Sequence, residues 1–467
     1  MLRSVVRRAF AASLLSTFTL ATGLQAQDAS SRPALGKGAT EALVARYEAA
    51  EHWVQKVVVL LSLNGYWHPS ADQMLISAMS DRDARLRAFG LEALLRADDA
   101  LMPMVATTAL LDELIQKQAG ASNKHYAARV QDALVRLAPD AGASKKSEWV
   151  RWWRERRDAH KPVEWVEKAQ PDAGAGGTAA AANRAFDLYQ SGLDLMLCID
   201  STGSMQPTID AVAAALGEMV DILDGISPKM RLGIVHYKDE GELGDSGAKV
   251  IQPLNKNIKT ARKKLEKLRA FGGGDLPEAV LGGLDLALHK KMKWKDDANK
   301  LVIVIGDAPP HPRHADTLVE LAKDAFERPG SHGVGNKKPT TGKRKLTPFL
   351  TSTMGVFVKP GPGIQVAAQF VQAQKQMRKD FEAVAKAGGG VFVEIEFVVD
   401  SVRPKTSKEK REEKEKREEK EKGAFENEAT RKVVEHILVL SFGERFRVEM
   451  RDFVRIFYEY KKAELIK

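Results

Sequence analysis

The sequence predicts two architectures in one chain: an all-α domain built from repeated helices, followed by a doubly wound α/β domain with a mostly parallel sheet. Residues 38–166 show only the helical spacing of apolar residues. Residues 190–399 instead alternate short apolar runs with amphipathic helical patterns. That alternation is typical of a parallel sheet covered by helices on both faces. A length of 467 residues accommodates both domains.

The helical region contains two similar segments, DRDARLRAFGLEALLRADD from Asp81 and HYAARVQDALVRLAPD from His125. Small residues such as Gly90 stand where neighbouring helices would approach closely. The pattern resembles a HEAT-like repeat, a pair of helices that buries its apolar face by stacking on its neighbours. We expect one long helix over Thr40–Leu61 in front of these segments.

Three tryptophans occur near the end of the helical region, in SEWVRWWRERRDAH. Trp149 shares a helical face with Trp152 or Trp153. We interpret the group as an aromatic plug that closes the last repeat, and a ligand platform is the alternative. The following residues, 167–189, are rich in glycine and other small residues and predict a linker.

The apolar runs of residues 190–399 are expected to be strands. They are LDLMLCI, RLGIVHY, KVIQPL, LVIVIG, TMGVFV and GVFVEIE. Most are continuous rather than alternating, which is typical of strands buried on both faces.

The first 26 residues have the order of a signal peptide. A basic start is followed by an apolar stretch and the small residue Ala26. The pair Arg7 and Arg8 leaves both a Sec and a twin-arginine signal open, and an uncleaved anchor is a third alternative. No later run approaches the roughly 20 apolar residues of a membrane-spanning helix. We therefore expect an exported protein, in the periplasm or cell envelope or secreted.

Net charge and cysteine content limit the possible classes of protein further. The formal charge is +10, and removal of residues 1–26 with their three arginines leaves +7. Such a charge suits an anionic surface, but no nucleic-acid signature with interleaved aromatics is present. The single cysteine, Cys198, excludes an intramolecular disulfide. No feature of the sequence specifies an oligomeric state.

The C-terminal part divides into two segments. Residues 404–423 carry the repetitive run KEKREEKEKREEKEK, whose charges nearly cancel, and predict a solvated linker. Residues 424–467 return to amphipathic helical spacing. We expect these helices to pack on the helical domain, with a partner-binding or membrane-binding helix as the alternative.

Three loops of the α/β domain should meet at the carboxyl ends of its strands, where ligands bind in open α/β sheets. IDSTGS follows the first strand and brings Asp200, Thr202 and Ser204. FGGGDLPEA brings Asp275, and IGDAPPH follows the strand LVIVI and brings Asp307. Carboxylate and hydroxyl oxygens are ligands for hard cations, so the pattern predicts a divalent-cation site.

This constellation resembles a von Willebrand factor A domain with a metal-ion-dependent adhesion site. Asp200, Thr202 and Ser204 match the family motif Asp-x-Ser/Thr-x-Ser, and Asp307 matches the aspartate after the fourth strand. The resemblance covers residues 190–399 and is strongest to a microbial and alpha-kinase-associated subgroup, although no kinase motif set is present. It implies a Rossmann-like fold and Mg²⁺, with Ca²⁺ or Mn²⁺ as alternatives. It also implies a protein partner that offers an acidic side chain.

The sequence departs from the family at Asp275, where the adhesion domains carry threonine. With Asp200 and Asp307, a third carboxylate would give a site with a divalent ion a formal charge of −1. Asp275 either contacts the metal or, alternatively, caps a helix beginning near Pro277 or hydrogen-bonds the glycine turn. Asp239 and His311 are expected at the rim of the site.

We therefore expect an exported, non-enzymatic binding or scaffold protein. In one alternative the cation only stabilises the fold and the helical repeats bind the partner. In another the protein is a metal-dependent hydrolase, although the motif shows no adjacent general base or phosphate-binding lysine loop.

Overall fold

The computed structural model describes residues 34–63, 65–120, 122–168, 180–273, 276–329, 347–360, 368–399 and 428–466. These residues form two compact units. The first comprises the described parts of 1–49 and 59–179, and the second those of 50–58 and 180–467. Residues 1–26, the predicted charged linker 404–423 and Asp275 lie outside the described residues.

The described part of the first unit consists of helices, apart from one isolated β-bridge between Leu35 and Trp67. Its α-helices are α2 (Lys37–Ala49), α3 (Trp53–Ser62), α4 (Asp72–Met79), α5 (Ala84–Leu95), α6 (Met102–Val105), α7 (Thr108–Gly120), α8 (Lys124–Leu137) and α9 (Lys146–Arg156). Helix α3 is shared with the second unit. The single helix expected over Thr40–Leu61 is wrong, because the chain leaves helical geometry between Ala49 and Trp53. The periodicity of apolar residues continues across this break and so conceals it from the sequence.

Close helix packing in the first unit depends on a small residue and a buried ion pair. A Cβ atom at Gly90 of α5 would lie 2.7 Å from Cβ of Ala78 in α4, so only glycine permits this approach. Glu92 of α5 is buried and accepts from Arg129 of α8, at 2.7 Å from Nε and 2.9 Å from Nη2. The assignment to HEAT-like repeats stays a prediction.

The three tryptophans of α9 are buried in the first unit. Trp149 Nε1 donates to Gln131 Oε1 at 2.7 Å, and Trp153 Nε1 donates to Asp112 Oδ1 at 2.7 Å. These contacts to α7 and α8 agree with an internal aromatic plug.

The second unit is built on a six-stranded sheet with the order β3-β2-β1-β4-β5-β6. The strands are β1 (Leu193–Asp200), β2 (Arg231–Tyr237), β3 (Ala248–Asn255), β4 (Asn299–Gly306), β5 (Phe349–Pro360) and β6 (Gly389–Val399). All neighbouring pairs are parallel except β2 and β3. The predicted doubly wound, mostly parallel sheet is therefore confirmed.

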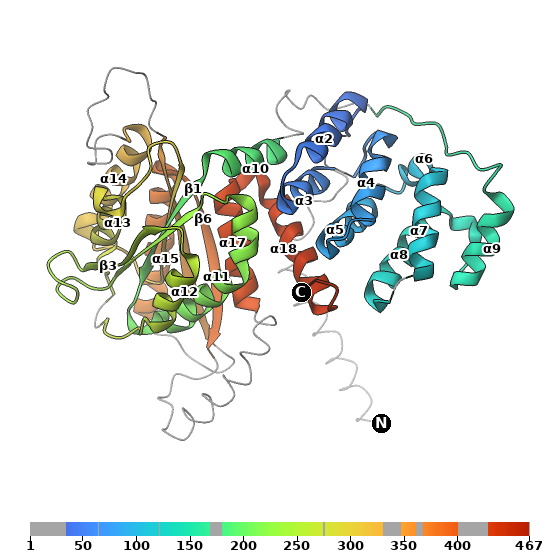
Figure 1. Ribbon diagram of the computed structural model, residues 1–467. Helices are drawn as coiled ribbons and strands as arrows, with labels where there is room; N and C mark the ends of the chain where they lie inside the picture. Colours follow the sequence, from blue (N-terminus) through green and yellow to red (C-terminus); the bar gives the residue numbers. More distant parts are fainter. Residues whose placement is uncertain are drawn as a thin grey trace, which may run out of the picture. The chain divides into compact units, whose positions relative to one another are not determined.

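Helices cover both faces of this sheet (Figure 1). Helices α13 (Val280–Leu288), α14 (Ala315–Glu327) and α15 (Ala368–Ala387) pack side by side on one face. The other face carries α10 (Ala180–Ser191), α11 (Gln206–Ile226), α12 (Ile258–Lys267) and α17 (Glu428–Phe442). Helix α18 (Arg447–Lys462) follows α17, and short 3₁₀ turns include η4 (Gly203–Met205) and η6 (Pro312–His314).

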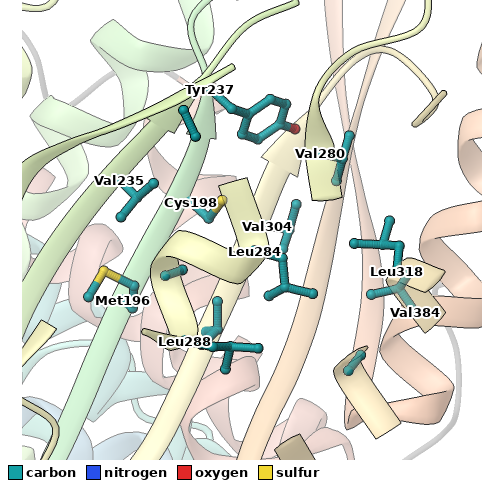
Figure 2. Close-up of a cluster of buried hydrophobic side chains, with 14 of the residues drawn as sticks. Met196, Cys198, Val235, Tyr237, Val280, Leu284, Leu288, Val304, Leu318 and Val384 are labelled. Atoms are coloured by element: carbon teal, nitrogen blue, oxygen red, sulfur yellow. The ribbon is translucent and has the colours of Figure 1, made fainter. Parts of the chain in front are cut away.

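The core beneath α13 fixes the position of the strand ends (Figure 2). Val280, Leu284 and Leu288 of α13 point toward Cys198, Val304 and neighbouring side chains of the sheet, and all of these residues are buried. Strand β1 is buried along its whole length, as its continuous apolar run predicts. Burial on both faces leaves little freedom to the loops that leave β1 and β4.

Helix α17 packs on the α/β domain, which corrects the expectation that it packs on the helical domain. Helix α18 does contact Trp53, a residue of the region 38–166 that we assigned to the helical domain. Helix α17 contacts α11 and β6, and α18 contacts α17. Amphipathic spacing identifies an apolar face but does not specify which surface it covers. Helix α10 also differs from expectation, because it begins within the segment 167–189 that we predicted to be a linker, and it packs on α11.

The second unit also includes a short segment far from the rest of its sequence, Ala50–Val58. The ring of Trp53 lies 6.0 Å from that of Phe453 and stacks at 6.4 Å on that of Phe457, both in α18. A Cβ atom at Gly225 of α11 would lie 2.4 Å from Val54 Cγ2, so the segment presses directly on the backbone of α11.

Among the described residues, no helix combines the length and the apolar character needed to cross a membrane.

Candidate metal centre

The site lies where the strand order reverses, between β1 and β4. The two strands are adjacent, with Ile199 opposite Ile305, and the chain leaves β1 toward β2 but leaves β4 toward β5. Asp200 ends β1 and Asp307 follows β4. The structure thus brings these two predicted residues to one edge of the sheet.

Asp200 is fully buried and organises the loop that follows it. Its Oδ1 accepts from Thr202 N and from Thr202 Oγ1, both at 2.8 Å. Its Oδ2 is buried and has no hydrogen-bond partner among the described residues. One oxygen therefore shapes the turn, and the other remains available to a ligand.

Ser204 joins the first loop to Asp307. Its side chain forms a hydrogen bond with Asp307, which is 4% exposed. Ser204 itself is exposed at the start of the turn that leads into α11, so the site reaches solvent on this side. Asp307 Oδ2, like Asp200 Oδ2, is buried without a hydrogen-bond partner in the described part of the chain.

The third carboxylate in the described structure is Glu278, which sequence reasoning did not select. It is 3% exposed, and its Oε2 has no described hydrogen-bond partner. Helix α13 begins at Val280, not near Pro277 as expected. Glu278 lies on an extended bridge to Pro310, with its N–H donating to Pro309 O at 2.9 Å.

Gly273 separates Glu278 from the first loop. A Cβ atom there would lie 2.9 Å from Thr202 Cβ and 3.6 Å from Glu278 Oε1. Its φ of +78° also favours glycine. Gly273 therefore lies close to both Thr202 and Glu278, where a larger residue would not fit. Asp275, the residue predicted from this loop, lies outside the described residues, so the structure does not test it.

The pKa of each of the three carboxylates is raised, mainly by burial. Burial, and then the charge of Asp307, raise the pKa of Asp200 to about 8. Burial, and then the charge of Asp200, raise the pKa of Glu278 to about 9. Burial also raises the pKa of Asp307, against the lowering effect of its hydrogen bond with Ser204. Each ionised group is therefore costly until a positive charge is supplied.

Two residues that the sequence did not single out support the loop from behind. Ser201 Oγ lies 2.9 Å from His236 Nδ1 and 3.1 Å from Tyr237 O, and Ser201 is fully buried. Lys238 is also buried, donates to Phe271 O and lies 3.8 Å from Glu242. Its ammonium attracts Asp200 without a hydrogen bond between them.

The predicted rim residues form a contact of their own. His311 Nε2 lies 3.0 Å from Asp239 Oδ1, and both side chains are partly buried. His314 Nε2 lies 3.0 Å from Glu240 Oε1, on which Arg313 also converges. These histidines face carboxylates, which favours a structural role at the rim over metal ligation.

The donor set fits a hard divalent cation better than a soft one. Among the described residues, no three His, Cys, Asp or Glu side chains are close enough to hold an ion by themselves. The available set is mixed: carboxylate oxygens of Asp200 and Asp307 with the hydroxyls of Thr202 and Ser204. Oxygen donors of this kind suit Mg²⁺, Ca²⁺ or Mn²⁺. The unpartnered buried oxygens are what such an ion would satisfy.

Comparison with known families gives the class of this domain. Residues 195–309 match the von Willebrand factor type A domain. The class of domain is thus established for this part of the chain, and the resemblance drawn from its motifs is confirmed at that level. Such domains typically mediate binding between proteins.

Two curated proteins are similar to part of this chain. The alpha-protein kinase vwkA of Dictyostelium discoideum is 32% identical over 124 residues, which are 26% of this chain and 19% of that protein. A putative ariadne-like RING finger protein, R811, of Acanthamoeba polyphaga mimivirus is 30% identical over 149 residues, 32% of this chain and 14% of that protein. The chain thus spans less than a fifth of the length of either relative.

Solved structures show weaker likenesses. BatB from Bacteroides thetaiotaomicron has 18% identity and a TM-score of 0.31, covering 49% of this chain and 98% of that one. The pilus adhesin SpaC from Lactobacillus rhamnosus GG has 13% identity and a TM-score of 0.30, and the match covers 45% of this chain and 28% of that one. The SpRpn10 VWA domain has 11% identity and a TM-score of 0.26, and the match covers 44% of this chain and 87% of that one. The family match, and not these scores, carries the assignment.

Proposed function

We propose that the chain is an exported, non-enzymatic binding protein that uses a divalent cation in its von Willebrand factor A domain to engage a protein partner. The observation that carries the proposal is the group of buried carboxylate oxygens without hydrogen-bond partners in the described structure: Asp200 Oδ2, Asp307 Oδ2 and Glu278 Oε2. Buried charge of this kind requires a counter-charge. Mg²⁺ is the preferred ion, with Ca²⁺ and Mn²⁺ as alternatives.

The cation would be held by Asp200, Thr202, Ser204 and Asp307, with Glu278 close enough to add its charge. The exposed position of Ser204 supports an approach of the partner from that side. A partner oxygen, such as that of an acidic side chain, would complete the coordination. Because Glu278 adds a third carboxylate to Asp200 and Asp307, the formal charge with a divalent ion is −1. Such a site favours strong cation binding over strong attraction of an acidic ligand.

The serine–histidine contact beside the site does not support hydrolysis. Ser201 is fully buried and its hydroxyl also contacts Tyr237 O, so it is not presented to a substrate. Burial, and then Lys238 and Lys249, lower the pKa of His236 to about 4. A catalytic triad instead places a carboxylate beside the imidazole, which favours its charged form. The pair is better explained as an anchor for the loop after β1.

Cation binding and partner capture test the proposal together. Mg²⁺ binding to the full chain, measured by calorimetry, should fall at least about 100-fold in Asp200→Ala. Capture of a partner from an envelope extract should be lost in the same variant and in chelator. Asp285→Ala, which removes an exposed acid of α13, is the matched control and should change neither.

Two results would contradict the proposal in different ways. Mg²⁺ binding that raises the melting temperature but leaves capture unchanged would favour a cation that only stabilises the fold. Unchanged Mg²⁺ binding in Asp200→Ala would show that the cation does not bind at the proposed site. Fractionation of the producing cells tests export separately.

A further inference from the structure

Helix α12 turns an unbalanced basic face to solvent. Its inward side chains are Ile258, Ala261 and Leu265, which are buried. We define the basic face as the exposed side chains of Lys259, Lys263 and Lys267, which lie one turn apart along the helix. None of the three forms an ion pair with a described residue, whereas Arg262 is paired with Glu266 at 2.7 Å. Like charges at this spacing on a helix repel one another.

Phe271 is an exposed aromatic side chain that is nevertheless held in place. It is 66% exposed, the largest exposed fraction among the exposed large apolar side chains of the described residues. Its N–H donates to Ser201 O at 3.2 Å, and its carbonyl accepts from Lys238 Nζ. The same ammonium lies 3.1 Å from the centre of the ring. One side of the ring is therefore occupied, and the exposed remainder faces solvent in a fixed orientation.

The basic face, Phe271 and the metal centre form one continuous rim. Lys267 and Phe271 are four positions apart in the chain, a span of at most about 14 Å. The connecting segment is fastened to the first site loop, because Ala270 N donates to Gln206 Oε1 at 2.8 Å and Gly203 N donates to Gly272 O at 3.1 Å. Gly203 directly precedes Ser204. A partner segment that binds the cation and continues along this side of the domain passes Phe271 first and α12 second.

We infer that the partner is an acidic protein segment that lies extended along this rim; this inference rests on the proposed function. One carboxylate reaches the cation, an apolar side chain packs on Phe271, and further acidic side chains meet the basic face. Spacing supports this chemistry. The three lysines are about 6 Å apart along α12, and side chains on one side of an extended chain repeat every 6.6–6.8 Å or so.

A synthetic peptide provides the probe. It carries one aspartate, an adjacent leucine, a Gly-Ser spacer of about four residues to cover the span to α12, and three glutamates at alternate positions. With a fluorescein label, its binding to the full chain is measured by anisotropy in Mg²⁺ at two salt concentrations. A second peptide with glutamines in place of the glutamates should bind about tenfold more weakly.

Three variants locate the binding. K259E/K263E/K267E should weaken binding of the acidic peptide at least about tenfold and remove most of its salt dependence. Phe271→Ser should weaken it about fivefold without changing the salt dependence. K290E/K291E/K295E makes the same change in charge before β4, at the opposite edge of the sheet, and should leave binding within about twofold.

The outcomes separate this inference from the proposed function. Equal binding by the α12 variant and wild type would overturn the inference even if Mg²⁺ dependence remained. Lysine-dependent binding that chelator does not weaken would support the basic face and contradict the cation-dependent function. Binding to vesicles of phosphatidylserine and phosphatidylcholine that depends on the lysines and exceeds peptide binding would also overturn the inference, in favour of a membrane surface.

Discussion

The two ends of β1 each carry an aspartate that is 0% exposed, but the two side chains differ in their hydrogen-bond partners. Asp194, at the start, accepts from Arg231 Nε at 2.8 Å and from Lys295 N at 2.9 Å. Asp200, at the end, uses one oxygen for Thr202 and leaves the other without a described partner. Burial alone therefore does not identify a functional acid. The difference is whether the described part of the chain satisfies both carboxylate oxygens with hydrogen bonds.

The largest effect on stability should come from removal of Asp194, the ion-paired aspartate at the start of β1. Asp194→Ala leaves the largely buried guanidinium of Arg231 without its carboxylate and should lower the free energy of unfolding by about 3–5 kcal/mol. Urea denaturation in chelator measures this change. Asp200→Asn, made at the unpaired end, should cost less than about 1 kcal/mol under the same conditions, because it also removes repulsion from Asp307. A larger loss in Asp200→Asn than in Asp194→Ala would break the comparison.

A smaller effect is expected at the carboxylate that joins the site from the glycine loop. Glu278→Gln should weaken Mg²⁺ binding about tenfold, since it removes a nearby charge but leaves the proposed ligands in place. Calorimetry measures the affinity. Glu92→Gln is the matched control in the helical unit, where the buried carboxylate already has Arg129 as its partner. If both variants bind Mg²⁺ as wild type does, Glu278 has no part in the site.

The smallest effect is a dependence of stability on pH. The folded-state pKa values of Asp200 and Glu278, about 8 and 9, lie above their ordinary values of 3.8 and 4.5. The folded protein therefore keeps protons that the unfolded chain releases. This contribution to stability is complete below about pH 4 and is lost as pH rises through 8 to 9.

In chelator, the melting temperature should thus fall by several degrees or so between pH 5 and pH 9. With Mg²⁺ the decline should shrink or reverse, because the cation binds the deprotonated carboxylates. Scanning fluorimetry at both conditions measures the two profiles. Profiles that decline in parallel would show that the carboxylates do not share a cation.

Much of the α/β fold followed from local pattern. Six apolar runs predict the six strands, and the rule that ligands bind at the carboxyl ends of strands brings Asp200 and Asp307 together. Thr202 and Ser204 are also found beside these two carboxylates, in hydrogen bonds with them. These features depend on short-range order along the chain, which sequence periodicity records well.

Features that depend on tertiary contacts could not be derived in this way. Proline before Glu278 suggested a helix start, but the pairing of Glu278 with Pro310 holds the segment extended and turns its carboxylate inward. Its position three residues after Asp275 was the only signal in the sequence. The C-terminal helices likewise show a clear apolar face, yet only packing on α11 and β6 reveals which surface it covers.

The segment Ala50–Val58 has a consequence for how this protein is made. Trp53 and its neighbour in the second unit, Phe453, are 400 positions apart, so a ribosome must deliver all the residues between them before they can meet. A fragment that starts at Ala180 would contain the complete sheet but would leave Phe453 and Phe457 without Trp53. For biosynthesis, the second unit therefore cannot be completed until residues 59–179 of the first unit have been made.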